Sequence, residues 1–197
     1  FPVSMAGEIK NFSPRAFNIP AKSLKVMNRT IQYALAASSR AAGHAGIADT
    51  TYDARRIGLS LGVNGIQYTA EELFLASYEA IGRDMRNYMD EEHRLDGGPI
   101  TLNDPSLAVH PLWPLSVLAN MSLCHIAIQH NAQGPNLSFS SLDASGGQAI
   151  GEAYRAIRQG ICDIFIAGGS YALNSLDVLS LSSLGLLARG EEPCRPF

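Results

Sequence analysis

The stretch from Pro135 to Gly169 constrains the fold of this chain more than any other part. Residues 137–140 alternate apolar and polar side chains, as a short strand does, and the chain then turns abruptly into a helix that begins near Ala144. After Gly160, residues 161–167 form a mostly apolar run that is typical of a strand buried on both faces. A strand, a tight turn, a helix and a second strand predict a right-handed βαβ unit in a parallel sheet.

The helix of this unit is unusually thin over its first turns. Ser145, Ala149 and Ala153 fall on one stripe, and Gly147 and Gly151 fall on the neighbouring stripe. Side chains this small let other backbone pack very close to a helix. We therefore expect the helix to lie in the middle of a layered α/β fold.

Asp143 is the candidate site residue in the turn before this helix. From residue preferences alone it is predicted to be the N-cap, with a carboxylate that accepts hydrogen bonds from the N–H groups of Ser145 or Gly146. Ser145 is a weaker candidate for a nucleophile, because Asp-Ala-Ser-Gly-Gly does not match the G-x-S-x-G elbow.

Composition limits the classes of function. The 15 basic and 18 acidic side chains give a net charge of −3, which argues against a nucleic-acid or membrane-surface protein. Neither the 3 cysteines nor the 5 histidines have the spacing of metal ligands, so no metal site is expected. No apolar run reaches the roughly 18 residues that a membrane-spanning helix needs. The expectation is a reduced, cytoplasmic protein.

Further elements are predicted on both sides of the central unit. The spacing of apolar residues indicates an amphipathic helix over residues 24–42 and a strand at residues 56–63. A capping box at residues 69–72 would open another helix, and Pro114 would begin one that is apolar almost all round. Residues 174–187 are predicted to form a last helix and loop.

A series of short motifs along the chain matches a pattern known from one family. In order they are Met27-Asn28-Arg29-Thr30-Ile31-Gln32-Tyr33-Ala34, Arg56-Ile57-Gly58, Ala119-Asn120-Met121, Gly134-Pro135-Asn136-Leu137, Ala144-Ser145-Gly146, Ala149-Ile150-Gly151-Glu152-Ala153, Ala167-Gly168-Gly169 and Arg195-Pro196-Phe197. Together they resemble the N-terminal half of the β-ketoacyl synthases, the condensing enzymes of fatty-acid and polyketide synthesis. The resemblance implies a thiolase-like layered α/β/α/β/α fold. Residues 1–197 would form the N-terminal half of this duplicated architecture, as an excerpt of a longer chain.

The central motif departs from this family at the nucleophile. The family has a cysteine in a T-A-C-A-S-G turn, whereas this chain reads Ser141-Leu142-Asp143-Ala144-Ser145-Gly146, so the resemblance puts Asp143 at the nucleophile's position. A helix N-terminus lowers the pKa of a thiol, and the thiolate accepts the acyl group from a carrier's thioester. A carboxylate would form a mixed anhydride that hydrolyses, so ordinary condensation at Asp143 is not expected. The resemblance also implies a structural role for Ser145.

The resemblance implies an acyl carrier protein as a partner. Lys22 and Lys25 match basic residues that dock this acidic protein in the family, although Val26 replaces a third basic position. The phosphopantetheine would arrive on the carrier, so no resident cofactor is expected. From the residues alone, a solvated helix end explains both lysines equally well.

The resemblance also implies a dimer, either a homodimer or a heterodimer with a ketosynthase. The turn and helix over residues 65–75, with Gly65, Ile66 and Leu73, would bind the substrate by lining the acyl chamber, partly across the subunit interface. The strand at residues 136–141 would pair with its counterpart in the partner subunit, which would remove an exposed sheet edge.

Three functions stay open at this point, and whether the protein is an enzyme stays open with them. The first is a non-condensing subunit similar to the chain length factors, which pair with an active ketosynthase and shape its chamber. The second is an acyltransferase-family enzyme of altered chemistry, such as a malonyl-carrier decarboxylase. The third is a β-ketoacyl-acyl-carrier-protein synthase whose cysteine has been changed deliberately or that acts through a partner.

Overall fold

A computed structural model of the chain describes residues 7–47, 52–63, 74 and 111–187. The chain divides into two compact units. One comprises residues 7–67 and 114–172, and the other comprises residues 1–6, 68–113 and 173–197. The first unit contains the predicted βαβ element and is described first.

A three-stranded parallel sheet forms the centre of the first unit. Strand β1 (Ile57–Gly62) lies between β2 (Asn136–Phe139) and β3 (Ile164–Gly169), and both neighbours run parallel to it. Every residue of β1 is buried, as expected for the central strand of a parallel sheet. The predicted strand at residues 56–63 and the predicted parallel βαβ arrangement are therefore confirmed.

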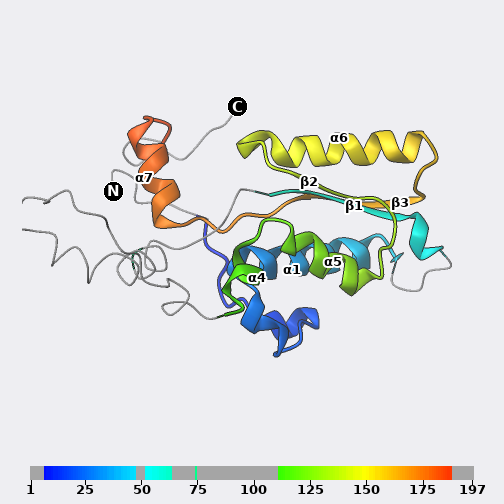
Figure 1. The fold of residues 1–197 in the computed structure, drawn as a ribbon, viewed down its shortest axis with the longest axis horizontal. Helices are drawn as coiled ribbons and strands as arrows, with labels where there is room; N and C mark the ends of the chain where they lie inside the picture. The colour runs from blue at the N-terminus through cyan, green and yellow to red at the C-terminus, as the bar shows by residue number, and fades with distance from the viewer. Residues whose placement is uncertain (1–6, 48–51, 64–73, 75–110, 188–197) are drawn as a thin grey trace, which may run out of the picture. The chain divides into compact units, whose positions relative to one another are not determined.

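Helices cover both faces of this sheet. Helices α1 (Arg29–His44) and α5 (Met121–His130) lie on one face, and α6 (Ser145–Arg158) lies on the other, as Figure 1 shows. The two faces are packed differently because alternate residues of β1 point to opposite sides. Leu59 and Leu61 belong to a hydrophobic core that they share with these side chains of α1 and α5: Ile31, Ala34, Leu35, Leu123 and Ile126.

The face of the sheet under α6 is packed with very small side chains. Ser60 is 0% exposed and donates a hydrogen bond of 2.7 Å from its hydroxyl to the backbone carbonyl of Ala149. A Cβ atom added at Gly62 would lie 2.4 Å from the backbone nitrogen of Gly146. The expected close approach of backbone to this helix is therefore confirmed, along the stripe that contains Ser145, Ala149 and Ala153.

The second small-residue stripe of α6 does not make such a contact within the described part of the chain. A Cβ atom at Gly147 would have nothing within 4 Å, and one at Gly151 would meet only the side chain of Arg155, at 3.9 Å. The same outward face exposes Ile150, Tyr154 and Ile157. Close packing therefore explains only the stripe that faces the sheet.

Two predicted helices have different bounds in the structure. Helix α1 begins at Arg29 rather than near residue 24, because residues 23–26 form a 3₁₀ turn and Met27 is extended. The side chain of Asn28 then caps the helix by accepting a hydrogen bond of 2.9 Å from the Ile31 N–H group. This cap was not recognised from the sequence, although asparagine is a preferred N-cap residue.

The helix predicted to begin at Pro114 is divided into α4 (Trp113–Val117) and α5. This segment is apolar almost all round, but the described chain covers only part of it. Val117, Leu123 and Ile126 are buried, but Leu118 and Ile128 are 43% and 78% exposed. Helices α4 and α5 therefore carry more apolar side chains than one face of the sheet can cover.

In the second unit the structure describes one helix of more than one turn, α7 (Ser175–Ser183). Its capping box joins Asn174, which accepts hydrogen bonds from the N–H groups of Leu176 and Asp177, to the Asp177 carboxylate, which accepts from the Asn174 N–H. The last predicted helix is thus confirmed. The capping box predicted at residues 69–72 lies outside the described residues. None of the helices that are described is long and apolar enough to cross a membrane.

Candidate functional site

A pocket of about 290 Å³ lies where the strands β1 and β3 end. Ligand sites of open parallel sheets form at this edge, because the connections leaving the carboxyl ends of neighbouring strands diverge there. Three segments line the pocket, namely the end of β1, the turn and first residues of α6, and the end of β3. In that order, their residues are Gly62 and Val63; Leu142, Asp143, Ser145 and Gly146; and Gly169, Ser170 and Tyr171. The candidate residue Asp143 is among them.

The turn before α6 is fixed by the hydroxyl group of Ser145. This oxygen accepts a hydrogen bond of 2.7 Å from the Ser141 N–H group and donates one of 2.7 Å to the carbonyl of Leu142. The side chain is 4% exposed. Both hydrogen-bonding roles of the hydroxyl are occupied, which agrees with the structural role that the resemblance implies and argues against Ser145 as a nucleophile.

Leu142 has a backbone conformation that is uncommon for a residue with a branched side chain. Its φ angle is +51°, in the left-handed region, and its side chain is 76% exposed. Such conformations persist only where surrounding interactions enforce them, and they concentrate at functional sites. The Ser145 hydroxyl supplies one of these interactions by holding the Leu142 carbonyl.

The prediction that Asp143 caps α6 is wrong. The residues 142–144 form a separate 3₁₀ turn, so the helix begins at Ser145 and its cap position falls on Ala144, with no side-chain cap. Asp143 is exposed and borders the pocket. No hydrogen bond or ion pair joins its carboxylate to another residue that the structure describes. The carboxylate is therefore available to a ligand of the pocket.

None of the residues that line this pocket is a cysteine. Cys162 is buried near Gly58 and Phe165, just before β3 begins and hence at the opposite end of the strand from the pocket. Burial raises the pKa of the Cys162 thiol, which makes it a poorer nucleophile. Cys124 lies in α5, on the other face of the sheet. Within the described ranges, no thiol borders the pocket.

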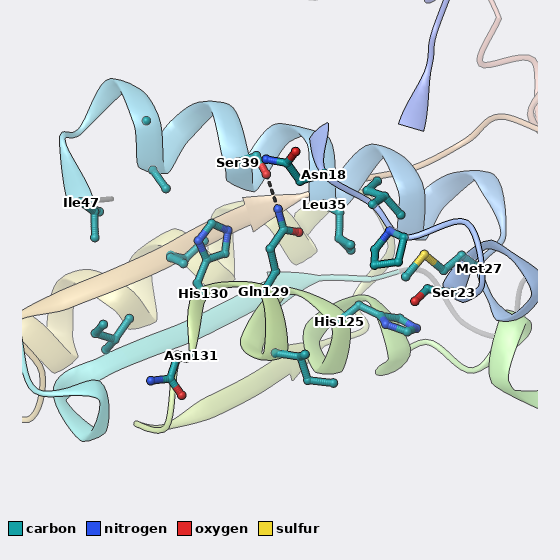
Figure 2. A pocket seen from close by; sticks show the side chains of 17 residues that line it. Asn18, Ser23, Met27, Leu35, Ser39, Ile47, His125, Gln129, His130 and Asn131 are labelled. Carbon is teal, nitrogen blue, oxygen red and sulfur yellow. Dashed lines mark hydrogen bonds between the residues drawn. The ribbon is translucent and has the colours of Figure 1, made fainter. Parts of the chain in front are cut away.

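A larger cavity, of about 700 Å³, lies between α1 and α5 (Figure 2). His130 lies with its Nε2 atom 3.1 Å from the Ser38 hydroxyl, and the Gln129 amide donates to Ser39. The Nε2 atom of His125 is buried with no hydrogen-bond partner. Burial lowers the pKa of both histidines, so both are favoured in the neutral form.

This larger cavity does not coincide with any predicted site residue. It is on the face of the sheet away from α6, and the residues that line it include no carboxylate and no thiol. Among the residues that the structure describes, no cluster of His, Cys, Asp or Glu could hold a metal ion. We therefore place the candidate site at the smaller pocket, where Asp143 lies.

The remaining predicted site residues are partly described. Lys22 precedes the 3₁₀ turn at residues 23–26 and Lys25 lies within it, and both side chains are exposed. The substrate-binding candidates Gly65, Ile66 and Leu73 lie outside the described residues. The structure therefore brings Asp143 to a pocket and leaves the two lysines on the surface of a separate segment.

Two pocket residues were missed by the sequence reasoning. Ser170 and Tyr171 follow β3 directly and line the pocket with Asp143. The Ser170 hydroxyl donates a hydrogen bond of 3.1 Å to the carbonyl of Thr30, and the Ala172 N–H donates one of 3.0 Å to the Thr30 hydroxyl, so this strand end is joined to α1. The paired glycines before Ser170 were the one signal in the sequence that could have pointed here.

The chain matches the family model described as "Beta-ketoacyl synthase, N-terminal domain" over residues 3–197. It is 26% identical over 203 residues to 3-oxoacyl-[acyl-carrier-protein] synthase 2 of Staphylococcus aureus strain N315, a match that covers 100% of this chain and 43% of the relative. The chain thus spans less than half the length of this curated relative.

Two solved structures resemble the fold. One, described as "The ishigamide ketosynthase/chain length factor", has a TM-score of 0.67 and 20% identity and covers 90% of this chain and 39% of that chain. The other is a type II polyketide synthase acyl-carrier protein in complex with its ketosynthase bound to the hexaketide, with a TM-score of 0.63, 17% identity, and coverage of 88% and 42%. At these identities the likeness shows the fold alone. Because the family model matches almost every residue, this chain belongs to the β-ketoacyl synthase family and has the thiolase-like α/β fold of its N-terminal domain.

Proposed function

We propose that this chain belongs to a ketosynthase-like subunit of fatty-acid or polyketide biosynthesis that does not itself condense acyl groups. It would act with an active ketosynthase and help to shape the acyl chamber, as chain length factors do. The observation that carries this proposal is the pocket before α6, which presents the carboxylate of Asp143 and no thiol.

The chemistry of condensation supports the proposal. A condensing enzyme must hold the acyl group as a stable thioester until the second substrate arrives. A carboxylate at Asp143 would give a hydrolysable anhydride instead. The hydroxyl of Ser145, in the same turn, is buried and already donates its proton to the Leu142 carbonyl. Neither side chain is suited to carry the acyl group through a catalytic cycle.

The position of β2 supports the proposed dimer. Among the strands that the structure describes, β2 lies at one edge of the sheet, and most of its residues are exposed. An exposed strand edge in a native protein is normally covered or paired. One similar structure is a ketosynthase/chain length factor assembly, and another includes an acyl-carrier protein. We therefore propose a ketosynthase and an acyl carrier protein as partners. The cytoplasmic location stays a prediction.

A second candidate function is decarboxylation of a malonyl group on its carrier. The pocket of about 290 Å³ favours this alternative, because space for a thioester is present beside Asp143. Decarboxylation does not require an acyl-enzyme, so the missing thiol does not exclude it. It would require catalytic groups beyond those that this pocket supplies.

The test is incubation of the natural protein with radiolabelled acyl and malonyl carrier protein, with and without its ketosynthase partner. The proposal expects no covalent label on the protein and no release of carbon dioxide by the protein alone. Carbon dioxide without a covalent adduct would favour the decarboxylase. Condensation by the protein alone would contradict the proposal.

The Asp143→Cys variant sharpens this test, with Asp143→Asn as the matched control. If the subunit is a scaffold, neither variant condenses. If the nucleophile is the only part that has changed, Asp143→Cys acquires an acyl label and forms product, whereas Asp143→Asn does neither. That result would identify an intact condensing enzyme and would overturn the scaffold assignment.

A further inference from the structure

Leu142 has a backbone conformation that suits other residue types better than leucine. In the described ranges, the other non-glycine residues with a positive φ angle are all asparagines: Asn11, Asn18 and Asn131. Asparagine tolerates the left-handed region because its short polar side chain can form local hydrogen bonds, whereas the Cβ atom of leucine is crowded there. Glycine or asparagine would therefore suit position 142 better, and the presence of leucine needs a separate explanation.

Packing within the described chain does not supply this explanation. Leu142 is 76% exposed, so its side chain gains little from burial. The turn is fixed through backbone atoms instead. The Leu142 carbonyl accepts hydrogen bonds from both the N–H and the hydroxyl of Ser145, and the Ser141 carbonyl accepts one of 3.2 Å from the Ala144 N–H. None of these contacts uses the side chain at position 142.

The other residues that line the pocket leave its size to few side chains. Three of them are glycines, which contribute only backbone: Gly62, Gly146 and Gly169. The hydroxyl groups of Ser145 and Ser170 donate to backbone carbonyls. Leu142 and Tyr171 are the large side chains left among the lining residues, and Leu142 is the one next to Asp143 in the chain. A change at Leu142 therefore alters the space beside the carboxylate most directly.

We propose that Leu142 limits the size of the acyl group that can enter the pocket beside Asp143. This inference rests on the proposed function, since it assigns the pocket to the acyl chamber, and it names a residue that shapes this chamber. The hydrogen bonds of Ser145 hold the turn, so the branched apolar side chain keeps its place at the pocket. A pocket of about 290 Å³ is at the small end of the range for ligand sites, which suits a short acyl group. A long chain would need the space that Leu142 occupies.

The experiment uses Asp143→Cys in the natural protein as a reporter of access to the pocket. Methanethiosulfonate reagents that carry a methyl or a decyl chain react with the new thiolate, which displaces methanesulfinate and forms a mixed disulfide. Each rate is divided by the rate of the same reagent with glutathione, and peptide mass spectrometry separates this label from labels on the chain's own cysteines. The methyl reagent is expected to label position 143 about tenfold faster than the decyl reagent.

Leu142→Ala in the same background should remove this selectivity. Alanine has the same crowded Cβ atom but lacks the branched end of leucine, so the decyl rate should rise by about tenfold and the methyl rate by about twofold or less. Leu142→Met keeps an apolar side chain of similar volume and should retain the selectivity. The matched control is Leu179→Ala, at an exposed leucine of α7 that is not among the lining residues, and it should change neither rate.

Thermal unfolding separates control of size from a structural role. Leu142→Asn introduces a residue type that tolerates the left-handed region, so it should raise the melting temperature slightly. Leu142→Ala should leave the melting temperature nearly unchanged, because little buried surface is lost. If both substitutions lower the melting temperature and Leu142→Ala leaves the selectivity unchanged, the leucine serves the fold and the inference is overturned.

Failure of this inference can be told apart from failure of the proposed function. If Asp143→Cys reacts equally fast with both reagents, or if neither reagent reaches it before or after Leu142→Ala, then Leu142 does not set the size of the pocket. The inference then fails while the proposed function stands. If Asp143→Cys instead condenses acyl and malonyl groups, the scaffold assignment fails, and the labelling rates still decide the role of Leu142.

Discussion

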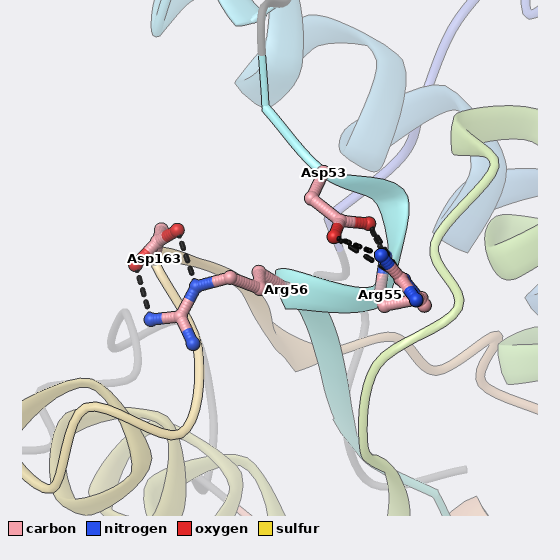
Figure 3. A network of polar contacts seen from close by, with 4 residues as sticks. All are labelled: Asp53, Arg55, Arg56 and Asp163. Carbon is pink, nitrogen blue, oxygen red and sulfur yellow. Dashed lines mark hydrogen bonds and ion pairs between the residues drawn. The ribbon is translucent and has the colours of Figure 1, made fainter.

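The two ends of the central sheet are built in opposite ways. At the amino end, Arg56 forms a two-pronged ion pair with Asp163, with contacts of 2.5 and 2.6 Å (Figure 3). Arg56 also donates a hydrogen bond of 3.1 Å to the Gly160 carbonyl. A local pair, Asp53 and Arg55, lies beside it. These contacts join the segment before β1 to the segment before β3.

At the carboxyl end the same strands finish in small residues. Gly62 ends β1 and Gly169 ends β3, and the two are opposite one another in the sheet. Long side chains and ion pairs are replaced there by backbone contact with α6 and by the pocket that Asp143 borders. One end of the sheet therefore joins distant segments of the chain, whereas the other brings backbone segments close together and leaves room for a ligand.

The largest expected effect comes from adding a methyl group at the carboxyl end. Gly62→Ala would place a Cβ atom 2.4 Å from the Gly146 nitrogen and 2.5 Å from the Ser145 carbonyl carbon, so backbone must move. We expect a loss of about 2–3 kcal/mol in the free energy of unfolding, measured with a chemical denaturant.

Gly147→Ala is the matched control for Gly62→Ala. The position has open space within 4 Å and lies in α6, so alanine should raise the free energy of unfolding by about 0.5–1 kcal/mol. Equal effects of the two substitutions would show that β1 and α6 are not in close contact at this end.

The next effect is expected at the turn that presents Asp143. Ser145→Ala leaves the Ser141 N–H and the Leu142 carbonyl without their present partner, and it should lower the free energy of unfolding by about 1–3 kcal/mol. Ser183→Ala removes an exposed hydroxyl that donates to the Leu179 carbonyl, and it should change stability by less than about 0.5 kcal/mol. A small effect at Ser145 would mean that other contacts fix the turn.

A smaller effect is expected at the amino end, where the ion pairs are exposed to solvent. Arg56→Ala should lower the melting temperature more than Arg55→Ala, because Arg56 joins segments 107 residues apart while Arg55 contacts a residue two positions away. Both losses should shrink in concentrated salt. If Arg55→Ala lowered the melting temperature more than Arg56→Ala, the long-range pair would not be the main stabilising contact at the amino end of the sheet.

The smallest effect is the pH dependence of this ion pair. Hydrogen bonds from Arg56 hold the pKa of Asp163 below its ordinary value of 3.8, so the folded state binds fewer protons than the unfolded state near that pH. The stabilisation is therefore present above this value and is lost as the pH falls through the lower pKa of the folded state.

Unfolding of the natural protein and of Asp163→Asn checks this dependence. The difference in melting temperature between them should be constant near neutral pH and should disappear in acid. A difference that grows as the pH falls would contradict the assignment of Asp163 as the stabilising, charged partner of Arg56.

The sequence predicted the central unit well because its signals are local. The alternation at residues 137–140, the apolar run before Gly168 and the small residues of α6 each reflect the residue types within one element, and the structure confirms all three elements. The last strand was expected to be buried on both faces from residue 161, but β3 begins at Ile164 and is only half-buried in the described chain. The errors fall at the ends of elements. Asp143 was assigned to the helix cap, but a 3₁₀ turn moves the start of the helix beyond it.

The parts of the site that could not be predicted depend on distant contacts. Ser170 and Tyr171 line the pocket only because β3 ends beside β1 and is joined to Thr30 of α1. Likewise, the sequence does not show that the Ser145 hydroxyl is occupied, because that depends on the left-handed conformation of Leu142. Such contacts join residues whose separation along the chain carries no periodic signal.

The sequence alone was enough to predict the order of strands and helices in the central unit and the family pattern, and it places a carboxylate, Asp143, in the turn before α6. Each of these follows from residue identity and short-range periodicity. Only the tertiary structure shows that the carboxylate is exposed at a pocket rather than engaged as a cap, and that the Arg29 guanidinium lies against the rings of Phe12 and Tyr33. These properties required the packed chain, since the free energy of a side chain depends on neighbours that only folding brings together.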